Sequence, residues 1–372
     1  MKFKDKLKGP WSLKKTFAAV LILILIPLIV YGANTGLRIF RLYDNVHEPI
    51  EDESAESSSP GAPEDPDDEN SEGESSVGSR TDEHAPVEDF SASQDANSDL
   101  DLVPIEGETA QDFQEIDHPF YEAATSEDVP HHLNILLLGL DENLDEPGRS
   151  DSIMVARLNT ETEEAAILSI PRDTYLYIPG SGYSKAGHMT AYGDTSLAVQ
   201  TIEGFLDISI DYFIRVDMSG FENSVDALGG VTVDIPEDLV HENGNVLFEA
   251  GEKHMDGEDV LDYTRARKLK EGSGGDLGRI SRQQQVLFEM LRKLRSELTM
   301  NETLDFMEEI TPYIRTNIGP AFVMEHWSDF QDLDLEAMDL RTLSGISFTH
   351  DNLFYFRVPV ENARIIIDHM AN

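Results

Sequence analysis

The 372-residue chain contains no cysteine, and its cations are scarce: 28 Lys and Arg stand against 72 Asp and Glu, for a formal net charge of −44. The lack of cysteine excludes disulfides, thiolate metal sites and a cysteine nucleophile. The shortage of cations argues against nucleic-acid binding, because phosphate neutralisation requires a basic face. The sequence also has no Walker A segment, G-x-S-x-G elbow, dinucleotide-binding fingerprint or H-E-x-x-H motif, so the enzyme classes that depend on them are not indicated.

The N-terminal region predicts a membrane anchor. Residues 1–15 are a lysine-rich tail, and residues 16–37, "TFAAVLILILIPLIVYGANTGL", carry no charge. About twenty apolar residues are enough to cross a ~30 Å hydrocarbon layer as a helix. The flanking lysines place the N-terminus in the cytoplasm and the remainder of the chain outside the cell, so we expect a single-pass protein of the cell membrane. A cleaved signal peptide is the alternative, but the apolar run is longer than a usual signal-peptide core.

Residues 44–130 are dominated by Asp, Glu, Ser, Pro and Gly, and Arg80 is their only Lys or Arg. Such a segment cannot bury enough apolar surface to offset its ordering entropy, and its charges repel one another. The composition therefore predicts a disordered acidic linker between the membrane and a folded domain. An acidic interaction tail is the alternative.

Residues 131–372 have the patterning of a globular domain. Short runs rich in branched residues predict buried strands, and segments with apolar positions three and four apart predict helices. We expect strands at 133–141, 152–159, 164–173, 211–218 and 231–237, and helices at 195–206, 221–230 and from near Gly278. These interleaved elements predict an α/β fold, an α/β/α-type sandwich with a central mixed sheet. We assign 131–300 to the main domain and 301–372 to a C-terminal extension of helix and strand packed on it.

The loop "GLDENLDEPGRSDS", residues 139–152, joins two predicted strands and holds Asp141, Arg149 and Asp151. Carboxylate oxygens on such a loop are what Mg²⁺ uses, usually one or two of them together with phosphate oxygens. A solvated turn fixed by Asx hydrogen bonds explains the same residues without a metal.

The stretch "DYTRARKLKEGSGGDLGRISRQQQ", residues 262–285, gathers arginines in an acidic chain. If Tyr263 to Arg267 is extended, Arg265 and Arg267 point to one face. Cations at the start of the following helix oppose its macrodipole unless an anion lies between them. Guanidinium groups and helix N-termini both favour phosphate. Three residues share that helix start: Arg279, Arg282 and Gln283.

Arg172 and Asp173, in "SIPRDT", follow the end of another predicted strand, which is where open α/β sheets bind ligands. The residues therefore indicate a phosphate or pyrophosphate site, and ion pairing of the arginines with the chain's own carboxylates remains the alternative.

Six motifs in order resemble the LytR-CpsA-Psr family over about Leu133 to Ser296: "NILLLGLD", "GRSDSIMVARLN", "LSIPRDT", "DYFIRVDMSGFENSVDALGGVTVDIPE", "DYTRARK" and "GDLGRISRQQQVL". The resemblance implies a phosphotransferase on the outer face of the membrane that moves a glycopolymer from a polyprenyl pyrophosphate carrier to peptidoglycan, releasing polyprenyl phosphate. It also implies an apolar channel for the prenyl tail, whose residues the sequence does not identify. The segment "SKAGHMTAYGD" departs from the family at Gly187, so we leave it out of the site.

The resemblance assigns the site residues as follows. It implies that the pyrophosphate is held by Arg149, Arg172, Arg265, Arg267, Arg279 and Gln283. Asp141 and Asp151 match the acidic positions associated with Mg²⁺, and Asp276 matches a further acidic position. We take Asp151, Arg265, Arg267 and Asp276 as the catalytic set, with Arg282 added to the substrate-binding residues from its position on the helix. Asp151 either accepts the proton of the attacking hydroxyl or only holds the metal.

Three other functions fit parts of the sequence. A polyprenyl-pyrophosphate phosphatase would use the same residues with water as the acceptor. A non-catalytic regulatory or binding protein of the membrane is a second alternative, and an inert acidic spacer is a third. The expected partners are a polyprenyl-pyrophosphate glycopolymer, peptidoglycan and, through the anchor, membrane lipid.

The acidity of residues 131–372 generates a first prediction. Asp and Glu greatly outnumber Lys and Arg there as well, so the linker does not account for the whole charge. We hypothesise that the domain faces a saline environment, where salt screens the repulsion between surface carboxylates. The midpoint of thermal unfolding should then rise as sodium chloride is added from low ionic strength. A midpoint that stays constant or falls would contradict the hypothesis.

Overall fold

The computed structural model describes His47–Glu48, residues 97–103 and most of residues 132–371, with short gaps of which 320–332 is the longest. The predicted basic tail 1–15, the anchor helix 16–37 and most of the linker 44–130 lie outside the described residues. Among the helices that the structure does describe, none is both long and apolar enough to cross a membrane.

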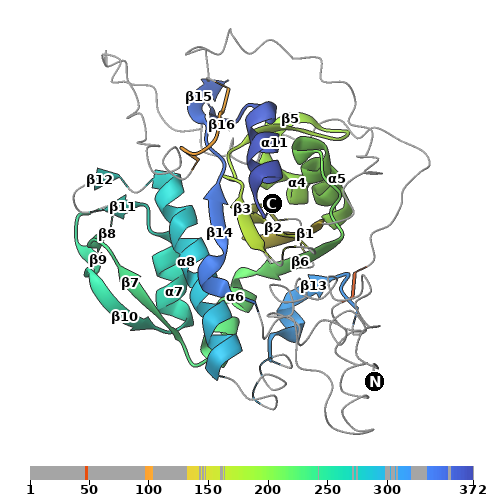
Figure 1. The fold of residues 1–372 in the computed structure, drawn as a ribbon. Helices are drawn as coiled ribbons and strands as arrows, with labels where there is room; N and C mark the ends of the chain where they lie inside the picture. Colours follow the sequence, from red (N-terminus) through yellow and green to blue (C-terminus); the bar gives the residue numbers. More distant parts are fainter. Residues whose placement is uncertain are drawn as a thin grey trace, which may run out of the picture.

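A six-stranded mixed sheet forms the centre of the molecule (Figure 1), in the order β13-β6-β1-β2-β3-β14. The β1–β6 and β3–β14 pairs are parallel and the other three pairs are antiparallel. This confirms the predicted central mixed sheet. Its strands are β1 (His132–Leu140), β2 (Ser150–Asn159), β3 (Ala165–Ser169), β6 (Tyr212–Asp217), β13 (Ile314–Thr316) and β14 (Asp339–Thr342).

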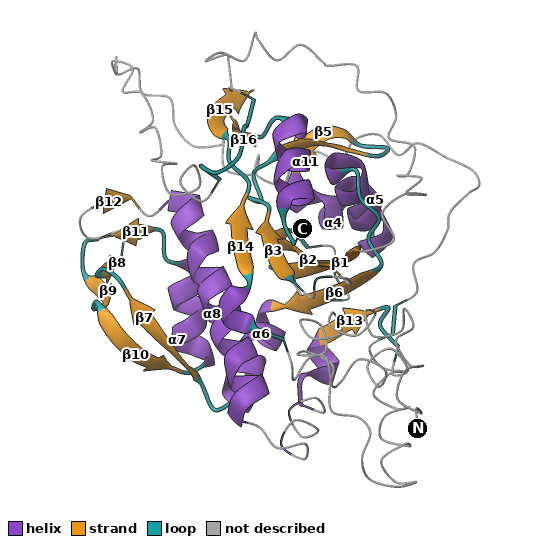
Figure 2. Ribbon diagram, viewed as in Figure 1, coloured by secondary structure: helices purple, strands orange, loops and turns teal. Residues whose placement is uncertain are grey.

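Both faces of the sheet are covered by helices (Figure 2), because side chains on a strand alternate between the two faces and both sets are apolar here. Ile135 of β1 belongs to one core, and Leu136 and Leu138 belong to the other. One face packs on α6 (Met218–Ala227), α7 (Gly257–Arg265) and α8 (Gly275–Glu297). The opposite face packs on α4 (Met189–Tyr192), α5 (Thr195–Leu206) and α11 (Val360–His369).

Smaller elements surround this sandwich. The hairpin β4–β5 packs on α5, the hairpin β15–β16 contacts β4, and two small sheets lie beside α7 (Figure 1). The strands outside the central sheet are β4 (Tyr175–Ile178), β5 (Gly182–Lys185), β7 (Val231–Ile235), β8 (Leu239–Val240), β9 (Val246–Phe248), β10 (Gly251–Met255), β11 (Lys268–Leu269), β12 (Gly272–Ser273), β15 (Ile346–His350) and β16 (Leu353–Arg357). In the part of the chain that the structure describes, the short 3₁₀ helices are η3 (Ala186–His188), η4 (Thr311–Tyr313) and η5 (Leu335–Ala337).

The predicted elements are largely present. The first three predicted strands correspond to β1, β2 and β3, and the helix predicted at 195–206 is α5. The helix predicted from near Gly278 begins three residues earlier, at Gly275. The C-terminal part of the chain supplies both edge strands of the central sheet, β13 and β14.

The condition that Tyr263 to Arg267 is extended is not met, because Tyr263 to Arg265 form the last turn of α7. Asp256 caps this helix by accepting a hydrogen bond from the backbone N–H of Asp259 at 3.0 Å. Val260 and Tyr263 are fully buried at a three-residue spacing. The N-terminal cap and the buried face therefore favour a helix over the extended strand that the two-residue spacing of the arginines allows.

Two pieces of the predicted linker lie against the domain, one at each edge of the sheet. The backbone N–H of Glu48 donates to the carbonyl of Thr316 in β13 at 2.9 Å. At the other edge, Asp99 makes two hydrogen bonds with Arg341 of β14, at 2.9 and 3.0 Å, and these lower the pKa of Asp99 to about 2. Asn362 of α11 exchanges two hydrogen bonds with the backbone of Val103.

The Asn362 contact can be tested by substitution. Asn362→Ala removes both hydrogen bonds to Val103 from a side chain that is 1% exposed, and it leaves the backbone groups of Val103 without that partner. We expect the free energy of unfolding to fall by about 1–3 kcal/mol, measured by urea denaturation. The exposed neighbour Glu361 serves as control, and Glu361→Ala should change stability little. Equal stability of the two variants would contradict the docking of residues 97–103.

Candidate active site

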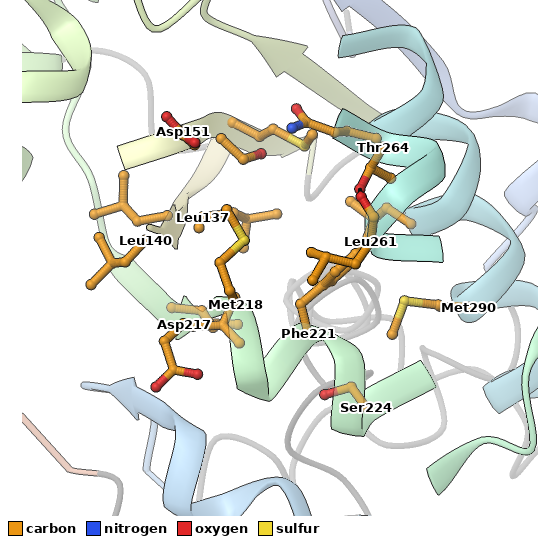
Figure 3. Close-up of a pocket in the computed structure, with 18 of the residues that line it drawn as sticks. Leu137, Leu140, Asp151, Asp217, Met218, Phe221, Ser224, Leu261, Thr264 and Met290 are labelled. Carbon is orange, nitrogen blue, oxygen red and sulfur yellow. Dashed lines mark hydrogen bonds between the residues drawn. The ribbon is translucent and has the colours of Figure 1, made fainter. Parts of the chain in front are cut away.

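A cavity of about 300 Å³ lies between the central sheet and the layer of α6, α7 and α8. Its walls are mainly apolar (Figure 3), and Met218, Phe221, Leu261 and Met290 line it from the helices. Further lining comes from Met154, Ile214, Val216, Leu287, Leu291, Leu294, Phe306, Ile310 and Ile314. The resemblance led us to expect an apolar channel, and the structure has an apolar cavity with these lining residues.

Polar residues from four segments line the same cavity. Asp151 lies near the start of β2, and Arg172 follows β3. Arg265 is the last residue of α7, and Arg267 lies two residues after it. Arg279 and Gln283 lie in the first turns of α8. The start of β2 pairs with the carboxyl end of β1, so these segments meet at the end of the sheet where α/β folds bind ligands. Six of the predicted site residues are therefore brought together by the fold.

Two short ion pairs organise the charges. Arg172 Nη1 lies 2.5 Å from Asp151 Oδ1, and Arg279 Nη2 lies 2.5 Å from Asp276 Oδ1. Burial raises the pKa of Asp276 and lowers the pKa of Arg279, and each partner opposes the shift of the other. Burial also acts to lower the pKa of Arg172, but the carboxylates of Asp151 and Asp173 outweigh it and the net shift is upward.

The buried guanidinium groups are not fully satisfied. Within the described residues, the Nε atoms of Arg172 and Arg279 have no hydrogen-bond partner, although both are buried. A buried donor left unpaired costs about 1–3 kcal/mol, more when it is charged. Arg265 and Arg267 add two exposed cations at the same place. This arrangement favours an anion with several acceptor oxygens, such as a phosphate group.

Asp141 and Arg149 pair with each other on the loop between β1 and β2. The carboxylate of Asp141 accepts hydrogen bonds from the backbone N–H of Arg149 at 2.6 Å and from its Nε at 3.2 Å. Neither residue lines the cavity, and Arg149 is 37% exposed. The pair closes the loop between β1 and β2, as in the Asx-type turn that we considered as an alternative.

Arg282, which we predicted as a substrate-binding residue, is not among the residues that line the cavity. Its side chain is 7% exposed, and it donates to the carbonyl of Tyr263 at 3.0 Å and to that of Ala266. Burial lowers its pKa to about 10. Arg282 therefore satisfies carbonyls at the C-terminal end of α7, and it stabilises the segment that carries Arg265 and Arg267 instead of lining the cavity itself.

The structure adds two residues that the sequence analysis left out. The backbone N–H of Gly187 donates to the carbonyl of Arg172 at 2.8 Å, and a Cβ atom at this position would lie 2.9 Å from the carbonyl oxygen of Ser150. Lys185 Nζ lies 3.3 Å from Asp173 Oδ1. The segment thus supports the loop of Arg172. The lysine and the glycine were visible in the sequence, but their proximity to Arg172 depends on the fold of β4 and β5.

Comparisons with known proteins agree with one another. A family model described as "LytR_cpsA_psr family" matches residues 103–372. The polyisoprenyl-teichoic acid–peptidoglycan teichoic acid transferase TagU of Bacillus cereus is 36% identical over 228 residues, which are 61% of this chain and 74% of that protein.

Two solved structures are similar over most of their length. Bacillus subtilis TagV has a TM-score of 0.55 and 27% identity, and the match covers 65% of this chain and 96% of TagV. A structure of TagT bound to LI-WTA has a TM-score of 0.53 and 26% identity, with 71% of this chain and 97% of TagT covered.

The contrast between Arg282 and Arg267 gives a prediction. Arg282→Ala leaves two buried carbonyls without their donor, so we expect the free energy of unfolding to fall by about 2–5 kcal/mol. Arg267→Ala removes an exposed side chain and should change stability by less than about 0.5 kcal/mol. Urea denaturation of both variants measures the difference. Comparable losses in the two variants would show that Arg282 does not have the structural role described.

Proposed function

The chain belongs to the LytR-CpsA-Psr family, and we propose that it is a phosphotransferase that attaches an anionic glycopolymer to peptidoglycan. The donor would be the glycopolymer on a polyprenyl pyrophosphate, and polyprenyl phosphate would be released. The observation that carries the proposal is a cavity with two chemically different parts: an apolar interior and arginines from three segments at one end. That combination fits a molecule with a long hydrocarbon tail joined to a pyrophosphate. The relatives named as teichoic acid transferases support the same class of reaction.

Each part of the donor has a complementary part of the cavity. The prenyl tail would pack between α8 and the sheet, where Met154, Ile214 and Leu291 are among the apolar lining residues. Burial of hydrocarbon contributes about 0.8 kcal/mol per CH₂, so the tail would supply much of the binding energy. The pyrophosphate would lie among the guanidinium groups, with the Nε atoms of Arg172 and Arg279 donating to its oxygens.

The chemistry follows from this orientation. A sugar hydroxyl of the acceptor attacks the phosphorus that bears the glycan, a new P–O bond forms, and the P–O–P bridge breaks. The bridging oxygen leaves with the electron pair as polyprenyl phosphate, which the cavity keeps buried. Arg172, Arg265 and Arg279 would neutralise charge on the phosphate oxygens as the bridge lengthens. Asp151 lines the cavity and pairs with Arg172, and we propose that it accepts the proton of the attacking hydroxyl.

We also propose Mg²⁺ as a cofactor. Within the described part of the chain, no group of three or more acidic or histidine side chains could hold a metal alone. Carboxylate oxygens suit Mg²⁺, which commonly takes one or two protein carboxylates together with phosphate oxygens and water. Asp151 is the main candidate ligand, and Asp141 is the second, although both of its oxygens already accept hydrogen bonds from Arg149. The ion would neutralise charge on the pyrophosphate.

The same proposal sets the location of the protein. Residues 16–37 would anchor the chain in the cell membrane, and the domain would lie on the extracellular side, where both a lipid-linked donor and peptidoglycan are present.

The reaction is tested by supplying the full-length protein with a polyprenyl pyrophosphate-linked glycopolymer, with and without peptidoglycan. A transferase yields a covalent glycan–peptidoglycan adduct and polyprenyl phosphate, both detected by mass spectrometry. Arg265→Ala should lower the rate of transfer by roughly 100-fold or more, since it removes a cation that stabilises the transition state. The matched control is Arg292→Ala, because Arg292 lies on the exposed face of α8 and pairs with Glu289.

The other outcomes are distinct. Release of polyprenyl phosphate without an adduct would identify a pyrophosphatase that uses water. Full activity of Arg265→Ala would refute the assignment of the site, and the absence of any reaction with an intact lipid-linked donor would favour a non-catalytic role.

A further inference from the structure

A cluster of aromatic side chains lies beside the candidate active site on the two hairpins β4–β5 and β15–β16. Along β4, Leu176 and Ile178 are buried in the core, so Tyr175 and Tyr177 project from the opposite face of the strand. Tyr183 of β5 is the cross-strand partner of Tyr177 and shares that face. We call these three half-buried residues, Tyr175, Tyr177 and Tyr183, the tyrosine face.

The second hairpin supports the tyrosine face from one side. Phe348 of β15 and Tyr355 of β16 are buried, stack on each other with ring centroids 5.5 Å apart, and both meet the ring of Tyr175 edge to face. Tyr175 stacks on Tyr183 at 5.2 Å, and Tyr177 meets Tyr183 edge to face at 5.5 Å. The rings are therefore held in a fixed arrangement by packing on a buried aromatic pair.

The tyrosine face is physically continuous with the arginines of the cavity. Lys185 connects them, because its Nζ atom lies 3.3 Å from Asp173 Oδ1 and 5.7 Å from the centre of the Tyr355 ring. Asp173 in turn lies 3.8 Å from Arg172 Nε, and its carbonyl accepts a hydrogen bond from the backbone N–H of Phe356 at 2.7 Å. Tyr175 follows Asp173 by two residues and Tyr177 by four, so the chain carries Tyr177 at most about 13 Å away from the loop of Arg172.

The charge of this region differs from the rest of the chain. Between Asp173 and Asp194 the sequence contains no Asp or Glu, although the whole protein has 72 of them. Lys185, which is the cation of the β4–β5 hairpin, is paired with Asp173. The β4–β5 hairpin that carries the three tyrosines thus has no carboxylate of its own and one paired lysine, which suits an uncharged ligand better than the polyanionic glycopolymer expected as the donor.

We propose that the tyrosine face binds the acceptor, with the sugar rings of an uncharged stretch of peptidoglycan glycan strand lying on Tyr175, Tyr177 and Tyr183. Pyranose rings present C–H groups on their faces and hydroxyls on their rims, so aromatic rings with polar edges match both features. A strand held there would run toward Arg172 and bring one sugar hydroxyl to the phosphorus under attack. This inference rests on the proposed transferase function, since it names the acceptor site of that reaction.

The test measures steady-state kinetics of the full-length protein with soluble, uncrosslinked glycan strands as acceptor and a lipid-linked glycopolymer as donor. Tyr183→Leu retains apolar volume but removes the ring. We expect it to raise the KM for the acceptor by roughly 3- to 10-fold, with kcat and the donor KM unchanged. Tyr183→Phe retains the ring and should stay within about 2-fold of the wild type. Phe354→Ala is the matched control, because Phe354 is an exposed aromatic residue on the opposite face of β16 from Tyr355.

Direct binding separates this inference from the proposed function. Titration of the protein with the same glycan strands, followed by calorimetry, should show binding that Tyr183→Leu weakens by a similar factor and Phe354→Ala does not. If the wild type binds strands in this way but forms no adduct, the transferase proposal fails and the saccharide site stands. An unchanged acceptor KM and unchanged binding in a folded Tyr183→Leu variant would overturn the inference. A rise confined to the donor KM would also overturn it, because the tyrosine face would then hold the glycan of the donor.

Discussion

Arginine side chains held at one end of an apolar cavity are the constraint on which the rest of this structure depends. Guanidinium groups are costly to bury, and an acidic chain offers many carboxylates that would neutralise them. Here three carboxylates are used, Asp151 and Asp173 with Arg172 and Asp276 with Arg279, and both arginines retain donors without a hydrogen bond. The fold thus retains an excess of positive charge next to a hydrocarbon-like interior, which is the property that an amphiphilic pyrophosphate requires.

Much of the surrounding structure supports this end of the cavity. Arg282 satisfies carbonyls at the end of α7 and so stabilises the segment of Arg265 and Arg267. Gly187 allows the backbone after β5 to approach the loop of Arg172. The Asp141–Arg149 pair closes the β1–β2 loop immediately before Asp151. These residues hold the segments that carry the site arginines and Asp151. Their substitution is therefore expected to change the stability of the protein or the geometry of the site more than the charge of the site.

The two described pieces of the predicted linker, His47–Glu48 and residues 97–103, and the tyrosine face extend this organisation beyond the cavity. Glu48 joins the β13 edge of the sheet and Asp99 joins the β14 edge, so the acidic segment is attached to the domain at two places. Along β4, apolar residues face the core and tyrosines face outward, starting two residues after Asp173. The cluster of arginines and the aromatic surface are therefore adjacent but chemically distinct. In the proposed reaction, this difference would allow one enzyme to discriminate between a charged donor and an uncharged acceptor.

The sequence by itself determined the order of most core strands and helices, the mixed α/β class and six of the residues that line the cavity. These features depend on local hydrophobic periodicity and on motifs whose residues are contiguous in the chain, so they can be detected from the sequence alone. The tertiary structure decided the rest. The helical conformation of α7 depended on its N-terminal cap and on the packing of its buried face. The contacts of Arg282 depended on its place on the side of α8 that faces α7. The apolar lining draws on residues from Leu137 to Ile314, and the tyrosine face draws on two hairpins far apart in the chain. Such groupings arise only when distant segments pack together, so no local pattern could have predicted them.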